Sequence, residues 1–239
     1  MSTNKDGFEY LICEKKIVYI LLMCSAGMMG AYTFNMRGGV FCNAQTANIV
    51  MMSIAFGKGN IRHGFYFLIP VFAYFFGAVL SEALPNPVKK LGFLRWDTYL
   101  IAFETLTLFL IGLIPLRMPD QIVQVIINFI ASMQYNTFRQ AEGIPMATTF
   151  CTNHIRQLGI AFVRVVKKHD RAALKRGSMH FFMVFSFFMG GMVLTFLCKP
   201  LQEKAIWLAL IPMGILLCSL VYADLTVEHD LLDRKPSGH

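Results

Sequence analysis

The sequence predicts an all-α, polytopic helical membrane protein made of two repeats, each with three spans plus one polar membrane-embedded or re-entrant segment. The 239-residue chain is 56% hydrophobic and 15% charged, whereas soluble domains carry roughly 25% charged residues. Several apolar runs reach the roughly 20 residues that a helix needs to cross a bilayer. A polar motif in the first half also returns in degenerate form in the second half. Together these observations favour a duplicated bundle of membrane helices.

Each half is predicted to run as span, polar segment, span and span. The ordinary spans are Ile17–Met36, Gly64–Leu84, Thr98–Leu116, Gln121–Thr137, Met179–Cys198 and Ala205–Ala223. The two segments interrupted by polar residues are Val40–Phe56 and Ile144–Val165. The chain then divides into a cytoplasmic N-terminal segment (1–16), membrane repeat 1 (17–116), membrane repeat 2 (117–223) and a polar C-terminal tail (224–239). We expect the tail to be frayed from Glu228 to His239.

The loops explain where the spans end. Pro85 and Pro87 predict a helix-stopping turn, because proline cannot continue a helix. The start of the chain lacks the pattern of a cleaved signal peptide, so the first span is expected to act as its own insertion signal. Lys and Arg, which give the chain a formal charge of +8, gather in loops, where they orient the spans and meet anionic lipid head groups. This distribution argues against nucleic-acid binding.

The sequence is compatible with two numbers of membrane crossings. If the polar segments re-enter without crossing, the protein has six spans and the second half is inverted relative to the first. If they cross, it has eight spans in a four-plus-four arrangement. The excess of Lys and Arg places the N-terminus in the cytoplasm in both cases and does not choose between them. We favour three plus three, because interrupted polar segments near the midplane are typical of inverted-repeat transporters.

The first polar cluster contains Asn43, Gln45, Thr46 and Asn48. On a helix, Gln45 and Asn48 are neighbours on one face, and Gly38-Gly39 just before them allows a sharp turn. Polar groups in hydrocarbon cost several kcal/mol, on the order given by transfer data, unless they find partners. These side chains therefore either bind a solute or hold helices together.

The second cluster contains Thr148, Thr149, Thr152, Asn153, His154 and Arg156. His154 is suited to titration near neutral pH and Arg156 to holding an anion. The threonine hydroxyls are equally suited to bonding their own helix carbonyls, and Arg156 to reaching the basic surface. Gln134 and Asn136 close the span Gln121–Thr137 and join the predicted substrate site.

Glu104 is an acidic residue in the middle of an apolar run. A charged residue at the centre of a membrane helix costs about 3 kcal/mol on the lenient insertion scale. We therefore expect Glu104 to face protein or water, either coupling transport to protons or pairing with a buried arginine or amide.

Catalytic and metal-binding patterns are missing from the sequence. The six cysteines form no C-x-x-C pair and no Cys/His ligand spacing, and we find no H-E-x-x-H, G-x-S-x-G or P-loop motif. We therefore expect no enzyme activity, metal or cofactor. Gly27, Gly30, Gly77, Gly190 and Gly191 are predicted to be close helix contacts.

The residues Gly-Gly-Val-Phe-Cys-Asn-Ala-Gln-Thr-Ala-Asn (38–48), with Ala31-Tyr32-Thr33-Phe34 before them and Ala147-Thr148-Thr149-Phe150 later, resemble the YoaK-like family. The resemblance covers about residues 17–223. It implies a bacterial cytoplasmic-membrane protein that transports a small molecule, with Asn43, Gln45, Thr46, Asn48, Glu104, Thr148 and Thr149 on the family's polar positions. This chain departs from relatives at Gly30, where they commonly have Asp, and at His154, where an amide is usual.

Three hypotheses for function follow. The first is a secondary transporter in the bacterial inner membrane with a midplane site built by the two polar segments, working without ATP by rocking of the two halves. The second is a membrane scaffold or sensor subunit that does not transport. The third, with least support, is an intramembrane enzyme. The expected partners are the lipid bilayer and an unknown small-molecule solute, and the sequence leaves a homo-oligomer open.

Overall fold

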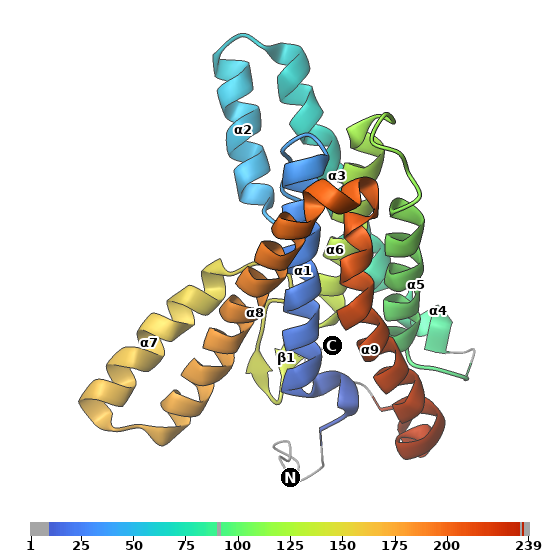
Figure 1. Ribbon diagram of the computed structural model, residues 1–239. Coiled ribbons are helices and arrows are strands. Elements are labelled where there is room, and N and C mark those ends of the chain that lie inside the picture. Colours follow the sequence, from blue (N-terminus) through green and yellow to red (C-terminus); the bar gives the residue numbers. More distant parts are fainter. Residues whose placement is uncertain (1–9, 90–91, 235, 237–239) are drawn as a thin grey trace.

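A computed structural model describes residues 10–89, 92–234 and 236 (Figure 1). Residues 1–9, part of the expected N-terminal segment, and residues 90, 91, 235 and 237–239 lie outside the described chain. The described chain is helical apart from one pair of two-residue strands, which confirms the predicted all-α class. The elements are η1 (Ile12–Glu14), α1 (Lys16–Met36), α2 (Gln45–Gly57), α3 (Ile61–Ala83), α4 (Pro85–Lys89), α5 (Trp96–Ile111), α6 (Asp120–Thr137), β1 (Gln140–Ala141), β2 (Ile144–Pro145), α7 (Thr152–Lys168), α8 (Arg171–Leu201), η2 (Gln202–Ala209), α9 (Leu210–Tyr222), η3 (Ala223–Val227) and η4 (His229–Leu231).

Two pairs of helices pack at very close range through glycine. In the pair α1/α8, a β-carbon added to Gly27 would overlap the carbonyl oxygen of Phe187, and one added to Gly190 would overlap that of Cys24. In the pair α3/α6, a β-carbon on Gly77 would overlap the carbonyl oxygen of Phe129. Small residues allow such backbone contact between membrane helices. The prediction that these three glycines form close helix contacts is confirmed.

The helices within each pair run parallel, and the two pairs run in opposite directions. Tyr19, near the start of α1, donates to the carbonyl of Gln140, which follows the end of α6. At the other end, Gln124 at the start of α6 donates to the carbonyl of Arg37, which follows the end of α1. α1 and α6 are therefore antiparallel.

Two helical hairpins project from opposite ends of this bundle (Figure 1). One consists of α2 and the start of α3, and the other of α7 and the start of α8. Before each hairpin, a stretch without regular helix returns from the end of α1 or of α6 toward the middle of the bundle. In the first stretch, Asn43 donates from its amide to the carbonyl of Ala26, near the middle of α1.

The apolar surface indicates a membrane protein. Within the described residues, three helical stretches are long and apolar enough to cross a bilayer, by length and composition: Lys16–Met36, Ile61–Ala83 and the continuous stretch Arg171–Val227, which holds α8, η2, α9 and η3. Phenylalanines such as Phe75, Phe76, Phe188 and Phe196 stay exposed on α3 and α8. A soluble protein rarely leaves such an apolar belt in water, whereas lipid accepts it.

One local prediction was right in part and another was wrong. α3 ends at Ala83, just before Pro85, as the predicted helix stop requires. Pro85 and Pro87 then begin and continue the short helix α4 instead of a simple turn, since proline fits the first turn of a helix, where its missing N–H is not needed. The C-terminal tail is not frayed at its start: Glu228 is 6% exposed and accepts a hydrogen bond from the backbone of Ile12 at 2.7 Å. Its partners, Ile12 and Arg95, are distant from it in sequence.

Candidate functional site

The first polar segment turns back into the bundle through two glycines. Gly38 and Gly39 have φ angles of 75° and 72°, in the left-handed region that favours glycine. A side chain at Gly38 would also meet the hydroxyl of Tyr66 and the amide of Gln124. Asn48 then closes the loop, because its amide accepts from the Phe41 N–H at 3.3 Å and donates to the Phe41 carbonyl at 2.8 Å.

The amides of this segment form a continuous network with α6. Asn48 donates to Gln45 at 3.1 Å, and Gln45 donates to the side chain of Asn128 at 2.7 Å. Asn128 donates in turn to the carbonyl of Gln124 at 2.7 Å. Asn43 donates to Ala26 at 3.0 Å and lies against Gly30, where any side chain would crowd its amide. The network ties the first segment to α1 and α6.

The second polar segment is held by Gln134 and a pair of histidines. Gln134 and Thr148 are fully buried, and Gln134 donates to the Thr148 carbonyl at 3.1 Å. The Gln134 Oε1 and the Thr148 hydroxyl have no hydrogen-bond partner among the described residues. Phe150 lies against the ring of Tyr135 in α6. Thr149 is also fully buried.

His154 pairs with His180, a residue that the sequence prediction missed. The His154 Nε2 lies 2.8 Å from the Ala147 carbonyl oxygen, and the two Nδ1 atoms lie 2.8 Å apart. A carbonyl only accepts, so the His154 Nε2 carries a hydrogen. In the neutral pair, the His154 Nδ1 must therefore accept from the Nδ1–H of His180. Both rings are buried, and together they join α7 to α8.

One cavity is shared by both polar segments. It has a volume of about 570 Å³ and lies between α1 and α8. Asn43 from the first segment and Cys151 from the second line it, together with Gly30, Phe34, Phe187 and Met192. Most of the lining is apolar, so a solute here would meet aromatic rings and few polar groups. Such a composition is typical of small-molecule sites.

Glu104 is buried but stands apart from these clusters. It is 1% exposed, and neither carboxyl oxygen has a hydrogen-bond partner among the described residues. The pairing partner expected from the sequence is therefore not found in the described chain. An ionised carboxylate without partners is very costly in such a place.

One end of the bundle is closed around Arg37. This side chain is fully buried and donates to the carbonyls of Pro115 at 3.2 Å and Ile114 at 2.5 Å, and to the hydroxyl of Tyr32 at 3.2 Å. Together with the bond from Gln124 to its own carbonyl, Arg37 joins α1 to α6 and to the loop after α5.

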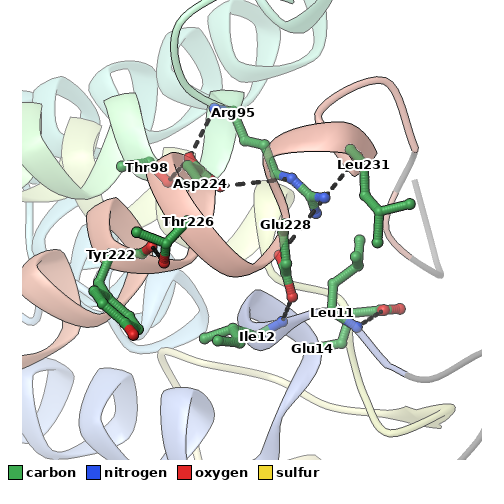
Figure 2. A network of polar contacts seen from close by, with 10 residues as sticks. All are labelled: Leu11, Ile12, Glu14, Arg95, Thr98, Tyr222, Asp224, Thr226, Glu228 and Leu231. Carbon is green, nitrogen blue, oxygen red and sulfur yellow. Dashed lines mark hydrogen bonds and ion pairs between the residues drawn. The ribbon is translucent and has the colours of Figure 1, made fainter.

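The opposite end is closed by an ionic clasp, made of Arg95, Asp224 and Glu228 (Figure 2). The Arg95 guanidinium lies 3.6 Å from a carboxylate oxygen of each acid and donates to the Leu231 carbonyl at 2.7 Å. Thr98 donates to Asp224 at 2.6 Å. Beside the clasp lies a polar cavity of about 410 Å³, whose lining includes Glu82, Arg95 and Arg139.

Because Glu228 belongs to the clasp and can titrate, we expect the free energy of unfolding to depend on pH. Burial raises the pKa of Glu228 above its usual range, and this outweighs the hydrogen bond from Ile12 and the nearby Arg95 charge, which lower it. The folded protein then binds this proton more tightly than the unfolded chain does. Between the ordinary glutamate pKa of about 4.3 and the higher folded value, the free energy of unfolding must fall as pH rises.

We expect Glu228→Gln, which keeps the acceptor for Ile12 but cannot titrate, to lose this part of the pH dependence. The measurement is the thermal midpoint of both proteins across the acidic range. The wild type should lose stability relative to the variant as pH rises through that window. A difference that stays constant with pH, or grows in the other direction, would contradict the prediction.

Of the predicted site residues, Asn43 lines the shared cavity and the others do not. Thr46 and Thr152 are exposed. Arg156 is exposed and donates to Asn153 at 2.9 Å on the outer face of α7. Asn136 lies at the clasp end, where it donates to Ser81 and Glu82.

The described residues contain no group of three or more His, Cys, Asp or Glu side chains arranged to hold a metal. No curated protein and no solved structure matches the chain. The family DUF1275, described as a protein of unknown function, matches residues 18–219. Since this match covers most of the 239 residues, the chain belongs to DUF1275, the YoaK-like family of proteins of unknown function.

Proposed function

We propose that the protein is a secondary transporter of a small molecule across the bacterial cytoplasmic membrane. The observation that carries this proposal is the cavity shared by Asn43 and Cys151, one residue from each polar segment. Two irregular segments that return to the middle of a helical bundle and meet at one cavity are the arrangement that many transporters use for a solute. Hydrogen-bonded amides beside an apolar wall suit a neutral or weakly polar molecule.

The proposal includes an inverted repeat with six crossings. In support, α1 and α6 open the two halves and run antiparallel, and α1 packs on α8 as α6 packs on α3. The glycine contacts correspond between the two pairs: Gly77 of α3 lies against Phe129 of α6, and Gly190 of α8 lies against Cys24 of α1. The second segment leaves α6, returns to Gln134 through Thr148 and departs along α7 toward the same end. Each polar segment is then re-entrant from its own side.

The N-terminal end of α1 is assigned to the cytoplasm. The clasp of Arg95, the buried tail and the basic turn between α7 and α8 lie at this end, and cytoplasmic loops carry the excess of Lys and Arg. Transport by alternating access requires the clasp and the contacts of Arg37 to open in turn. The clasp links Arg95, before α5, to Asp224 and Glu228, after α9, and Arg37 accepts at its carbonyl from Gln124 of α6.

A non-transporting scaffold is the second candidate. The observation that favours it is the completeness of the amide network, in which Gln45, Asn48 and Asn128 are already bonded to one another. A solute that uses these amides must displace existing hydrogen bonds. A scaffold would keep them permanently, as glue between membrane helices.

Ligand screening separates the two functions. The purified protein would be screened against metabolites by thermal shift, and each stabilising solute tested for uptake into proteoliposomes. We expect Asn43→Ala, which removes the polar side chain that the first segment places in the cavity, to weaken stabilisation and uptake. Thr46→Ala, an exposed change in the same motif, is the matched control and should behave as wild type. If no solute stabilises the wild type, or if Asn43→Ala responds as the wild type does, the site assignment is wrong.

Cysteine labelling tests the topology. A cysteine replacing Lys58 should react with an impermeant reagent from outside the cell, and one replacing Lys89 only from the cytoplasm. Reaction of position 58 from the cytoplasmic side alone would instead support eight spans.

A further inference from the structure

The hairpin of α7 and α8 carries a dense set of cations at its tip. We name Lys167, Lys168, Arg171, Lys175 and Arg176 the basic tip; all five are exposed. Among the described residues, none of them forms an ion pair with an acid. The one acid between them, Asp170, accepts from the N–H groups of Ala172 and Ala173 and so caps α8. The tip therefore presents its charge to its surroundings.

The hairpin holds this charge in a fixed place. Gly177 of α8 lies so close to Ala161 of α7 that a β-carbon would stand 2.9 Å from the alanine side chain. Nearer the bundle, His154 and His180 hydrogen-bond across the two helices at 2.8 Å. His169 ends α7 with a left-handed φ of 49°, which reverses the chain within two residues. These contacts make the hairpin a rigid projection.

Apolar side chains flank the basic tip on the same hairpin. Phe162 is 69% exposed, Val166 and Leu174 are each 58% exposed, and Phe181 is 53% exposed. A helix with cations on one side and large apolar groups on the other lies in the boundary between lipid head groups and acyl chains. A soluble polyanion would satisfy the cations but leave these apolar groups in water.

From this juxtaposition we propose that the basic tip is a binding site for anionic phospholipid head groups of the leaflet on its own side, with the exposed apolar side chains of the hairpin inserted among the acyl chains. The proposal rests on the chain being a membrane protein and is independent of transport. The projection at the opposite end, α2 with the start of α3, has only Lys58 and Arg62 as cations along its turn, residues 57–63, and is not expected to select anionic lipid.

The test compares lipid binding by the full-length protein in neutral detergent at low salt. Fluorescent short-chain phosphatidylglycerol is titrated against phosphatidylcholine of the same chain length. Since each cation near an anionic surface strengthens binding severalfold, the wild type should prefer phosphatidylglycerol on the order of tenfold or more. Added salt should shrink this preference.

The key variant replaces all five residues of the basic tip by glutamine and should bind both lipids alike. Lys58→Gln with Arg62→Gln is the matched control at the opposite hairpin and should keep the preference. Equal affinity of the wild type for both lipids, or a preference insensitive to salt, overturns the proposal without any variant. Tighter binding of an acidic peptide than of phosphatidylglycerol at the same five residues also overturns it and assigns the tip to a protein partner.

Discussion

Replacing Gly27 by alanine is expected to lower the free energy of unfolding by about 3 kcal/mol, the upper part of the usual range for overpacking. The added β-carbon would overlap the backbone carbonyl of Phe187. A backbone atom cannot rotate out of the way as a side chain does, so α1 and α8 must separate and lose contact. Gly190→Ala should behave in the same way, because its β-carbon would overlap the carbonyl of Cys24.

Gly214→Ala is the matched control for this prediction. Gly214 is also in a helix, α9, but a β-carbon there would meet no atom within 4 Å. Alanine favours the helix by about 1 kcal/mol over glycine, so this variant should be unchanged or stabilised. Unfolding in detergent, followed by circular dichroism, gives both numbers. If Gly27→Ala is as stable as Gly214→Ala, the backbone contact between α1 and α8 does not exist.

Replacing Arg95 by methionine is expected to cost about 3 kcal/mol, as for the removal of one partner from a buried ion pair. Asp224 and Glu228 are 1% and 6% exposed, and the change leaves both beside an apolar side chain. Glu228 can then take up a proton, so the loss should be smaller in acid than at neutral pH. Thermal unfolding at the two pH values measures the effect.

Arg139→Gln serves as the control, because Arg139 forms an ion pair with Glu82 that is largely open to solvent. The side chains of Arg139 and Glu82 are 38% and 71% exposed, at an N···O distance of 2.6 Å. Exposed pairs contribute at most about 1 kcal/mol. Equal losses from the two variants would show that burial of the clasp does not determine its strength.

The helical class was predictable because long apolar runs and polar loops are local features. The close contacts of Gly27, Gly77 and Gly190 were predictable for a related reason, since glycine in a membrane helix has few other uses. The strands β1 and β2 and the burial of Glu228 were not. Glu228 is one polar residue in a polar tail, and its burial depends on Arg95 and Ile12, which a linear pattern does not connect to it.

Only part of the candidate site was visible in the sequence. Gln45 and Asn48 lie together as their helical spacing predicts, yet Thr46, on the same helix, points outward and is exposed. His180 was missed because it begins an apolar run, where a lone histidine carries no spacing signal. The signal that could have found His180 is the free-energy cost of placing a polar ring in an apolar membrane helix. Asn43 and Cys151 line one cavity although they are far apart in sequence, so their proximity follows from helix packing and not from a local pattern.

The backbone contacts of α1 with α8 and of α3 with α6 have a mechanical consequence. Helices pressed together through glycine behave as one solid piece, because sliding would drive carbonyls into neighbouring backbones. The stiff bodies of the molecule are therefore α1 with α8 and α3 with α6. Each body takes one helix from residues 17–116 and one from residues 117–223. Any large movement is therefore expected to occur between these two bodies, and neither sequence half can move as a unit.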